Sequence, residues 1–362
     1  MRFIFHPAQL PQDQLLLQHI NTAAQRLFDK LKKLDIDSLT ISDYTKKYLS
    51  THVSHLERML QTYSYIMAWS LTSKKPRCVF TDYGGGAGIL SFLAKECGVP
   101  TVVYTDIYDV SCRDVRIIGE TIHNKPDYYV EGDINDVISF FKTQGLLCDV
   151  IASYDVIEHI YDVEGFFSKL HDIPGDLLTV VMASGANMYH PLIRRHIMKK
   201  QREIEHENRL EEWGHKKRDS LQAYHTIRKE IIHAYAGNLT MREVENLARV
   251  TRGKIKADIL LCVDAYLKTG YVPRELNHPT NTCDPYTGNW AEHLMNPYQL
   301  RDILLHSGLD AKLLMGYYGH YRRTIKHILG RILNVAIYLM GKHGIRIAPF
   351  FTIYGKRKIQ KE

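Results

Sequence analysis

The chain has 362 residues, 45% of them hydrophobic, and carries a net charge of +7 at neutral pH. Its length exceeds that of one typical domain, so we expect a main domain with additions, while the modest charge without long runs of Lys or Arg does not indicate a nucleic-acid-binding protein. Six cysteines without a C-x-x-C pair, and the absence of an apolar stretch long enough to span a membrane, favour a cytoplasmic protein with reduced thiols and no transmembrane segment.

The first part of the chain has the apolar spacing of helices. Leu15, Leu16 and Ile20 fall on one such stripe, and a second stripe runs through residues 56–67. We therefore expect residues 1–75 to form a helical N-terminal extension that packs against the main domain.

Residues 79–90 combine an apolar strand, a glycine-rich turn and a helix start. Glycine is favoured where the backbone turns sharply and a ligand approaches it closely. Gly84, Gly86 and Gly88 stand at alternate positions, whereas a dinucleotide fingerprint needs G-x-G-x-x-G and would place a third glycine where Ile89 stands. The loop therefore predicts a nucleoside cofactor other than a dinucleotide, although a glycine turn of this kind can also be purely structural.

The next elements repeat a strand that ends in an acidic residue. Asp106 closes a predicted strand over residues 101–105, and Asp133 follows another over residues 128–130. An acid at the end of the second strand is placed to accept both ribose hydroxyls of a nucleoside. A fourth strand, over residues 148–153, leads into a polar segment.

These motifs, taken in order, resemble those of class I S-adenosylmethionine (SAM)-dependent methyltransferases over about residues 76–183. The segment 154–160 resembles the E-x-x-E-H segment of ubiquinone-pathway and small-RNA O-methyltransferases, with Asp155 in place of the first Glu. The resemblance implies an α/β fold with a Rossmann-like seven-stranded sheet, helices on both faces, and SAM as the cofactor. We expect the cofactor to contact Asp82, Gly84, Gly85, Gly86, Gly88, Asp106, Ile107, Asp133, Ile134, Ser153 and Tyr154.

The remainder of the chain interrupts the core and then completes it. A fifth strand is predicted over residues 177–183, and a polar helical insertion follows, with a capping box at Thr240 and Glu243. The sixth and seventh strands are expected over residues 308–318 and 349–356. The predicted organisation is an N-terminal extension (1–75), a SAM-binding core (76–188 and 276–362) and a helical substrate lid (189–275).

Residues 328–340, between the last two strands, are largely apolar, with Arg331 and Asn334 as interruptions. A helix of this kind can lie on a membrane surface or pack against a core. We expect burial against the core.

The acceptor is expected beyond the ends of the fourth and fifth strands, where His159, Glu158 and His190 are the candidate catalytic residues. Neutral imidazole can take a hydroxyl proton near neutral pH, so His159 is the expected general base. Trp290 and His293 are further candidates for acceptor binding, because polar and aromatic residues are concentrated just before the core resumes. This predicts methyl transfer to a hydroxyl of a small-molecule acceptor.

Three alternatives remain open at this stage. Asp155, Glu158 and His159 could instead hold a divalent metal that orients a vicinal diol. The chain could also bind SAM as a regulatory protein without catalysis, and transfer to nitrogen or carbon is not excluded. DNA is not an expected partner, because no Asn-Pro-Pro-Tyr follows the fourth strand.

Overall fold

The computed structural model describes residues 10–53, 55–72, 77–209, 220–272, 274–319 and 325–357. Its centre is a seven-stranded sheet with the order β3-β2-β1-β4-β5-β7-β6, in which β7 runs antiparallel to the other six strands. This confirms the predicted Rossmann-like seven-stranded sheet. The strands are β1 Val79–Tyr83, β2 Thr101–Asp106, β3 Tyr128–Glu131, β4 Val150–Tyr154, β5 Thr179–Ser184, β6 Leu309–Met315 and β7 Phe351–Arg357.

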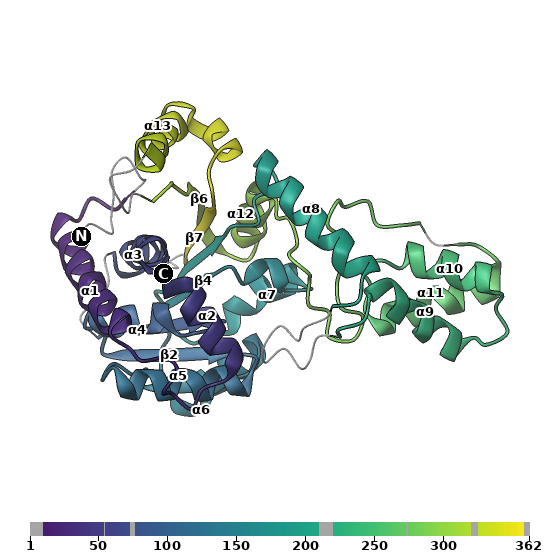
Figure 1. The fold of residues 1–362 in the computed structure, drawn as a ribbon, viewed down its shortest axis with the longest axis horizontal. Coiled ribbons are helices and arrows are strands. Elements are labelled where there is room, and N and C mark those ends of the chain that lie inside the picture. The colour runs from purple at the N-terminus through teal and green to yellow at the C-terminus, as the bar shows by residue number, and fades with distance from the viewer. Residues whose placement is uncertain are drawn as a thin grey trace, which may run out of the picture.

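Helices cover both faces of the sheet, as predicted (Figure 1). Successive side chains of a strand point to opposite faces, so Phe80 belongs to one apolar layer and Val79 to the other. The helices of the core are α4 Ile89–Glu96, α5 Asp109–Thr121, α6 Ile134–Gln144, α7 Val163–Lys169, α12 Pro297–His306 and α13 Ile325–Leu339. The layer with Phe80 contains residues of α4 and α5, whereas the layer with Val79 contains residues of α6, α7 and α12.

The fourth to seventh strands are each shorter than the sequence predicts, and hydrogen bonds explain this for the fourth and the sixth. The fourth begins at Val150, because the Cys148 amide donates to the Pro174 carbonyl, outside the sheet. The sixth ends at Met315 because the chain then turns towards helices, where the Tyr317 hydroxyl donates to the Gln61 carbonyl. The polar groups that leave the sheet are thus satisfied elsewhere.

The N-terminal extension forms α1 Gln14–Lys32, α2 Asp43–Val53 and α3 Leu56–Leu71. Buried side chains of α1 and α3, among them Leu27 and Ile66, join the apolar layer on the face that carries Phe80. The extension therefore packs against the sheet, as expected.

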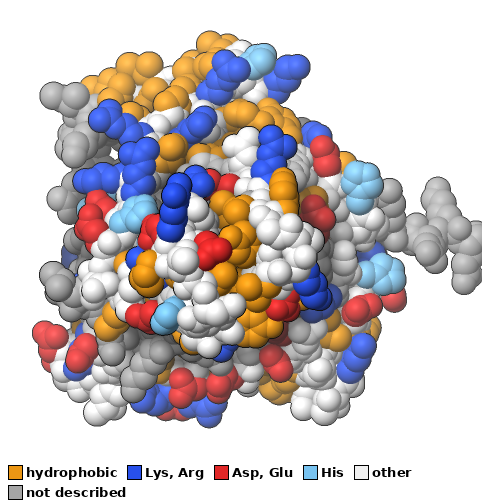
Figure 2. All heavy atoms as spheres, turned by 90° about the vertical axis from the view of Figure 1, so that its right-hand side faces the viewer, with side chains coloured by type: hydrophobic (Ala, Val, Ile, Leu, Met, Phe, Trp, Pro, Cys, Tyr) orange, Lys and Arg blue, Asp and Glu red, His pale blue; other side chains and the backbone are white. Residues whose placement is uncertain are grey.

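The insertion forms α8 Pro191–His206, α9 Tyr224–Tyr235, α10 Met241–Val250 and α11 Lys256–Thr269. The predicted capping box at Thr240 and Glu243 opens α10. Helix α8 leads away from the sheet, and α9, α10 and α11 pack around a core of their own beside it (Figure 1). Seen from that side, the surface mixes acidic and basic side chains (Figure 2).

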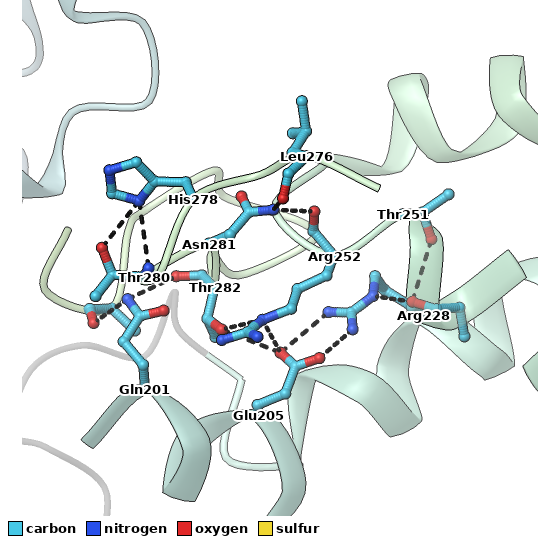
Figure 3. A network of polar contacts seen from close by, with 12 residues as sticks. Gln201, Glu205, Arg228, Thr251, Arg252, Leu276, His278, Thr280, Asn281 and Thr282 are labelled. Carbon is cyan, nitrogen blue, oxygen red and sulfur yellow. Dashed lines mark hydrogen bonds and ion pairs between the residues drawn. The ribbon is translucent and has the colours of Figure 1, made fainter. Parts of the chain in front are cut away.

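A buried polar network fixes this three-helix bundle to α8 (Figure 3). Arg228 of α9 is fully buried and forms an ion pair with Glu205 of α8, while its Nε donates to the Ala248 carbonyl over 2.8 Å. Arg252 donates to the Thr282 hydroxyl over 2.8 Å and lies 3.8 Å from Glu205. Because buried charges are costly unless paired, these contacts hold the bundle, α8 and the loop around residue 282 in one arrangement.

Candidate active site

A cavity of about 2380 Å³ opens at the carboxyl ends of β1 to β4, where ligands bind in open parallel sheets. Its walls come from the loops after these strands, from α2 and α3, from the C-terminal half of α8 and from the loop at residues 287–292. Of the residues predicted for the cofactor, the following line it: Gly84, Gly85, Gly86, Asp106, Ile107, Asp133, Ile134 and Tyr154.

The glycine loop after β1 has a left-handed backbone at Gly84, Gly86 and Gly88, with φ of 67°, 51° and 75°. A Cβ on Gly84 would lie 2.8 Å from a methyl group of Val156, and a Cβ on Gly88 would lie 2.6 Å from one of Val115. A Cβ on Gly86 would meet nothing within 4 Å. Gly84 and Gly88 therefore allow close packing of the loop, whereas Gly86 leaves its backbone open to the cavity.

Asp106, the last residue of β2, connects this loop with the next one. Its carboxylate accepts hydrogen bonds from the Gly86 and Tyr108 amides, each over 3.0 Å. Burial raises its pKa to about 6, against the lowering effect of these hydrogen bonds. The carboxylate still borders the cavity, so it holds the glycine loop and also faces a ligand.

Asp133 follows β3 and forms the N-cap of α6. Its Oδ1 accepts from the Asn135 amide over 2.7 Å, and Asp136 reciprocates in a capping box. Ile107 and Ile134 add apolar surface to the same wall of the cavity. An acid beside two apolar side chains suits a flat ring with a polar edge.

The structure places Asp82, Gly88 and Ser153 behind the cavity rather than on its wall. Asp82 is 2% exposed and accepts from the amide and the hydroxyl of Ser91, over 2.9 and 2.8 Å. It pairs in register with Tyr104, two residues before Asp106, and so lies about 7 Å deeper in the sheet at the usual rise per residue. Its carboxylate therefore ties β1 to α4.

Asp155 and Glu158 follow β4. Asp155 has a positive φ of 53°, and its Oδ1 accepts from the Gly185 amide over 2.6 Å. Its carboxylate borders the cavity, and the protein that surrounds it on the other sides raises its pKa to about 6. Glu158 is only 1% exposed, and burial, followed by repulsion from Asp155, holds its pKa well above its usual value. Glu158 therefore lies behind the cavity wall, and its burial favours the neutral carboxyl over the carboxylate.

His159 lies on the wall of the cavity. Its Nδ1 is 2.9 Å from the Trp290 carbonyl, which can only accept, so this nitrogen carries the proton. Nε2 is then the basic nitrogen of the neutral ring. The Trp290 ring stacks on Tyr161 at 5.4 Å and also lines the cavity, which fixes the segment that positions His159.

His190 does not reach the cavity wall. Its Nδ1 accepts from the Ile193 amide over 3.4 Å at the start of α8. Its Nε2 lies 3.2 Å from the hydroxyl of Tyr318, which itself donates to the Ile347 carbonyl. With both nitrogens engaged, His190 caps a helix and links two loops.

The predicted metal site is not supported by a cluster of ligand side chains among the described residues. Within the described part of the chain, no group of three or more His, Cys, Asp or Glu side chains is arranged to hold a metal ion. Asp155 and His159 face the cavity, while Glu158 is buried behind them. Asp155 and Glu158 interact with each other, but together with His159 they do not form such a group.

The loop before α12 has two roles: one part of it lines the cavity, and another part supports the segment after β4. Trp290 lines the cavity, but His293 stacks between His278, at 4.1 Å, and Trp290, at 4.4 Å. Burial, and then His278, lowers the pKa of His293 to about 4. The His293 amide donates to the Glu158 carbonyl, so this loop supports the segment after β4.

The sequence analysis missed a group of tyrosines that line the cavity opposite the glycine loop. Tyr44 and Tyr48 come from α2, and Tyr63 of α3 meets Tyr154 edge to face at 5.8 Å. Burial raises the pKa of Tyr63 well above its usual value, so its hydroxyl remains a neutral hydrogen-bond donor. The spacing of Tyr44 and Tyr48, four residues apart on one helix face, was the available signal.

Comparisons with known proteins point to methyltransferases. No protein-family model matches the chain. Over 78 residues the chain is 35% identical to the ribosomal protein L11 methyltransferase of Burkholderia orbicola, a stretch that makes up 20% of this chain and 26% of that protein. The chain thus spans about a quarter of the length of that relative.

Solved structures that align with the chain include a SAM-dependent methyltransferase from Archaeoglobus fulgidus, with a TM-score of 0.40, 14% identity, and coverage of 86% of this chain and 99% of that one. Magnesium protoporphyrin IX methyltransferase from Synechocystis PCC 6803, bound to S-adenosylhomocysteine (SAH), aligns with a TM-score of 0.38, 14% identity, and coverage of 91% and 94%. Plantazolicin methyltransferase in complex with SAH aligns with a TM-score of 0.37 and 12% identity, and the alignment covers 95% of this chain and 100% of that one. The sheet order of the chain itself confirms the Rossmann-like fold.

Proposed function

We propose that the chain is a SAM-dependent methyltransferase that transfers a methyl group to a hydroxyl of a small-molecule acceptor. The observation that carries this proposal is the cradle formed by Gly86 and Asp106. Here an open glycine backbone and a carboxylate share one hydrogen bond at the carboxyl ends of adjacent parallel strands. Such a site suits a nucleoside whose ribose hydroxyls donate to the acid.

The residues of this wall fit the cofactor part by part. The backbone of the glycine loop would hold the amino-acid portion, Asp106 the ribose, and Asp133 with Ile107 and Ile134 the adenine. Bound there, SAM supplies an electrophilic methyl group on its sulfonium. What remains for the protein is to align the acceptor and to remove its proton.

The tyrosine wall is the proposed acceptor side. Tyr48, Tyr63 and Tyr154 offer aromatic faces and neutral hydroxyl donors, which suit an acceptor with a flat or apolar body. The cavity extends further, to Lys200 and Ile204 of α8 and to Tyr224 at the start of α9. We therefore propose that the insertion acts as a lid through α8 and the start of α9, while α10 and α11 stand beyond them.

His159 is the proposed general base. With SAM bound, the cofactor would supply the methyl group and Nε2 of His159 would take the proton of the acceptor hydroxyl, so that the products would be the methyl ether and SAH. The Trp290 carbonyl stabilises the resulting imidazolium, because it accepts from Nδ1.

The test is methyl transfer from labelled SAM to a panel of hydroxylated acceptors, followed by identification of the product. We expect His159→Ala to lower turnover by roughly 10²–10⁴ while SAH affinity, measured by calorimetry, stays within a few fold. Normal turnover in this variant would exclude His159 as the base, and transfer to nitrogen or carbon would correct the acceptor group.

A further inference from the structure

Helix α13 carries an apolar face that the described part of the protein leaves uncovered. Asn334 and Ile337 are buried, at 3% and 7% exposure, but the opposite side of the helix is open. This corrects the expectation that residues 328–340 are buried against the core: only one narrow side of the helix packs. The exposed apolar side chains are Ile328 (60%), Leu329 (54%), Ile332 (60%), Val335 (48%), Tyr338 (67%), Leu339 (75%) and Met340 (40%).

These residues form a patch rather than scattered exposures. Ile328, Ile332, Val335 and Leu339 follow the spacing of a single helix face. Single exposed leucines are ordinary, but a contiguous apolar face marks a surface that another body covers.

The surroundings of this face are basic. From residue 325 to residue 350, which covers α13 and the turn after it, the sequence holds four Lys or Arg and no Asp or Glu. Arg331, Lys342 and Arg346 are exposed on α13 and the turn that follows it. At the top of Figure 2 hydrophobic side chains lie beside Lys and Arg side chains, with few acidic ones near them. Charge complementarity therefore favours an anionic partner with an apolar interior.

We propose that residues 328–346, the amphipathic face, bind the surface of an anionic lipid bilayer. The apolar side chains would enter the boundary between headgroups and acyl chains while the basic side chains contact anionic headgroups. Helix α13 has 15 residues, about 22 Å at the usual rise, which is shorter than a bilayer core. Within the described part of the chain, no helix is long and apolar enough to cross a membrane, so the helix lies in the plane of the surface.

The amphipathic face is directly joined to the cavity. Asn334 donates to the Tyr318 carbonyl over 2.9 Å and accepts from the Tyr318 amide over 2.7 Å. Tyr317 and Tyr318 line the cavity together with Phe350. A bilayer bound to the exposed side of α13 would therefore be separated from the cavity wall by the thickness of this helix, about 10 Å. The lipid binding itself does not depend on the proposed function.

Vesicle flotation of the full chain tests the proposal. We expect the chain to float with vesicles of phosphatidylcholine containing phosphatidylglycerol, and less with phosphatidylcholine alone. The double variant Leu329→Glu and Ile332→Glu should lower the bound fraction at least about ten-fold, because it places two charges in the apolar face. The matched control changes Leu261 and Leu267 to Glu on α11, where both are exposed at 66% and 47%, and should bind as the wild type does.

A second set of variants tests the charges without altering the apolar face. Arg331→Gln, Lys342→Gln and Arg346→Gln should each lower affinity for anionic vesicles by roughly five-fold and leave binding to neutral vesicles unchanged. Equal flotation of the wild type and the Leu329→Glu, Ile332→Glu variant would overturn the proposal. So would a wild type that forms a dimer and ignores vesicles, with the Glu variants monomeric, because a second copy would then cover the face. Thermal unfolding and SAH titration of each variant identify loss of fold separately.

Discussion

Gly86 and Gly98 form a matched pair that isolates the cofactor role of the glycine loop. Both have a positive φ, 51° and 76°, and a Cβ on either would meet nothing within 4 Å. Only Gly86 lies on the cavity wall, whereas Gly98 follows α4 on the outer surface. The two sites therefore impose the same kind of backbone strain on an alanine and differ in what the new methyl group faces.

The expected magnitudes follow from this difference. Alanine in the left-handed region costs about 1 kcal/mol, so Gly86→Ala and Gly98→Ala should lose similar amounts of free energy of unfolding. A methyl group on residue 86 would also occupy space that the cofactor needs. Overpacking of this kind costs about 1–3 kcal/mol, or roughly 5- to 150-fold in the Kd for SAH.

Calorimetric titration with SAH, together with thermal unfolding of each variant, measures both quantities. Gly98→Ala should bind SAH as the wild type does, and Gly86→Ala should not. If the two variants had equal affinity, the cofactor would not approach the loop at Gly86, and the assignment of the cradle would be wrong. A Gly86→Ala variant that unfolds far more readily than Gly98→Ala would show that the open space at residue 86 is part of the fold.

Three further predictions concern buried charges. Asp106→Asn should weaken SAH binding by about 1.5–3 kcal/mol in calorimetry, and an unchanged Kd would exclude a ribose contact. Burial raises the pKa of Asp82 to about 7, so its contribution to stability is complete below its ordinary pKa of 3.8 and is lost as the pH rises through 7. Asp82→Asn should remove the part of the decline in Tm between pH 4 and 8 that comes from this carboxyl. Parallel declines in wild type and variant would refute the raised pKa of Asp82. Glu205→Gln leaves the buried Arg228 without its ion pair, so denaturant unfolding should show a loss of about 3–5 kcal/mol, whereas a loss below 1 kcal/mol would mean that water reaches this network.

The sheet and the placement of several predicted residues on the cavity wall were predictable because their signals are local. A strand, a turn and a helix start occur within residues 79–90, and an acid ends the next strand only a few residues further along. The pattern of parallel strands then brings all these ends to one edge. The position of Asp106 on the cavity wall follows from that rule.

The acceptor side was less predictable because it is assembled from distant parts of the chain. Tyr48 and Tyr154 line one cavity although more than a hundred residues separate them. The tautomer of His159 is set by the Trp290 carbonyl, which no local pattern connects with it. Contacts of this kind depend on how α2, α3 and the insertion pack, and amphipathic spacing alone does not specify that packing.

Asp82 and Asp106 show that the same residue type, in similar motif positions, can have different structural roles. Both are aspartates near the end of a parallel strand, and both have a raised pKa because of burial. The register of β1 and β2 places Asp82 beside Tyr104, two residues deeper than Asp106, so one carboxylate meets Ser91 under the loop and the other meets the cavity. Depth along the strand, which becomes fixed only when the two strands pair, thus separates a carboxylate that supports the glycine loop from one that can contact a ligand.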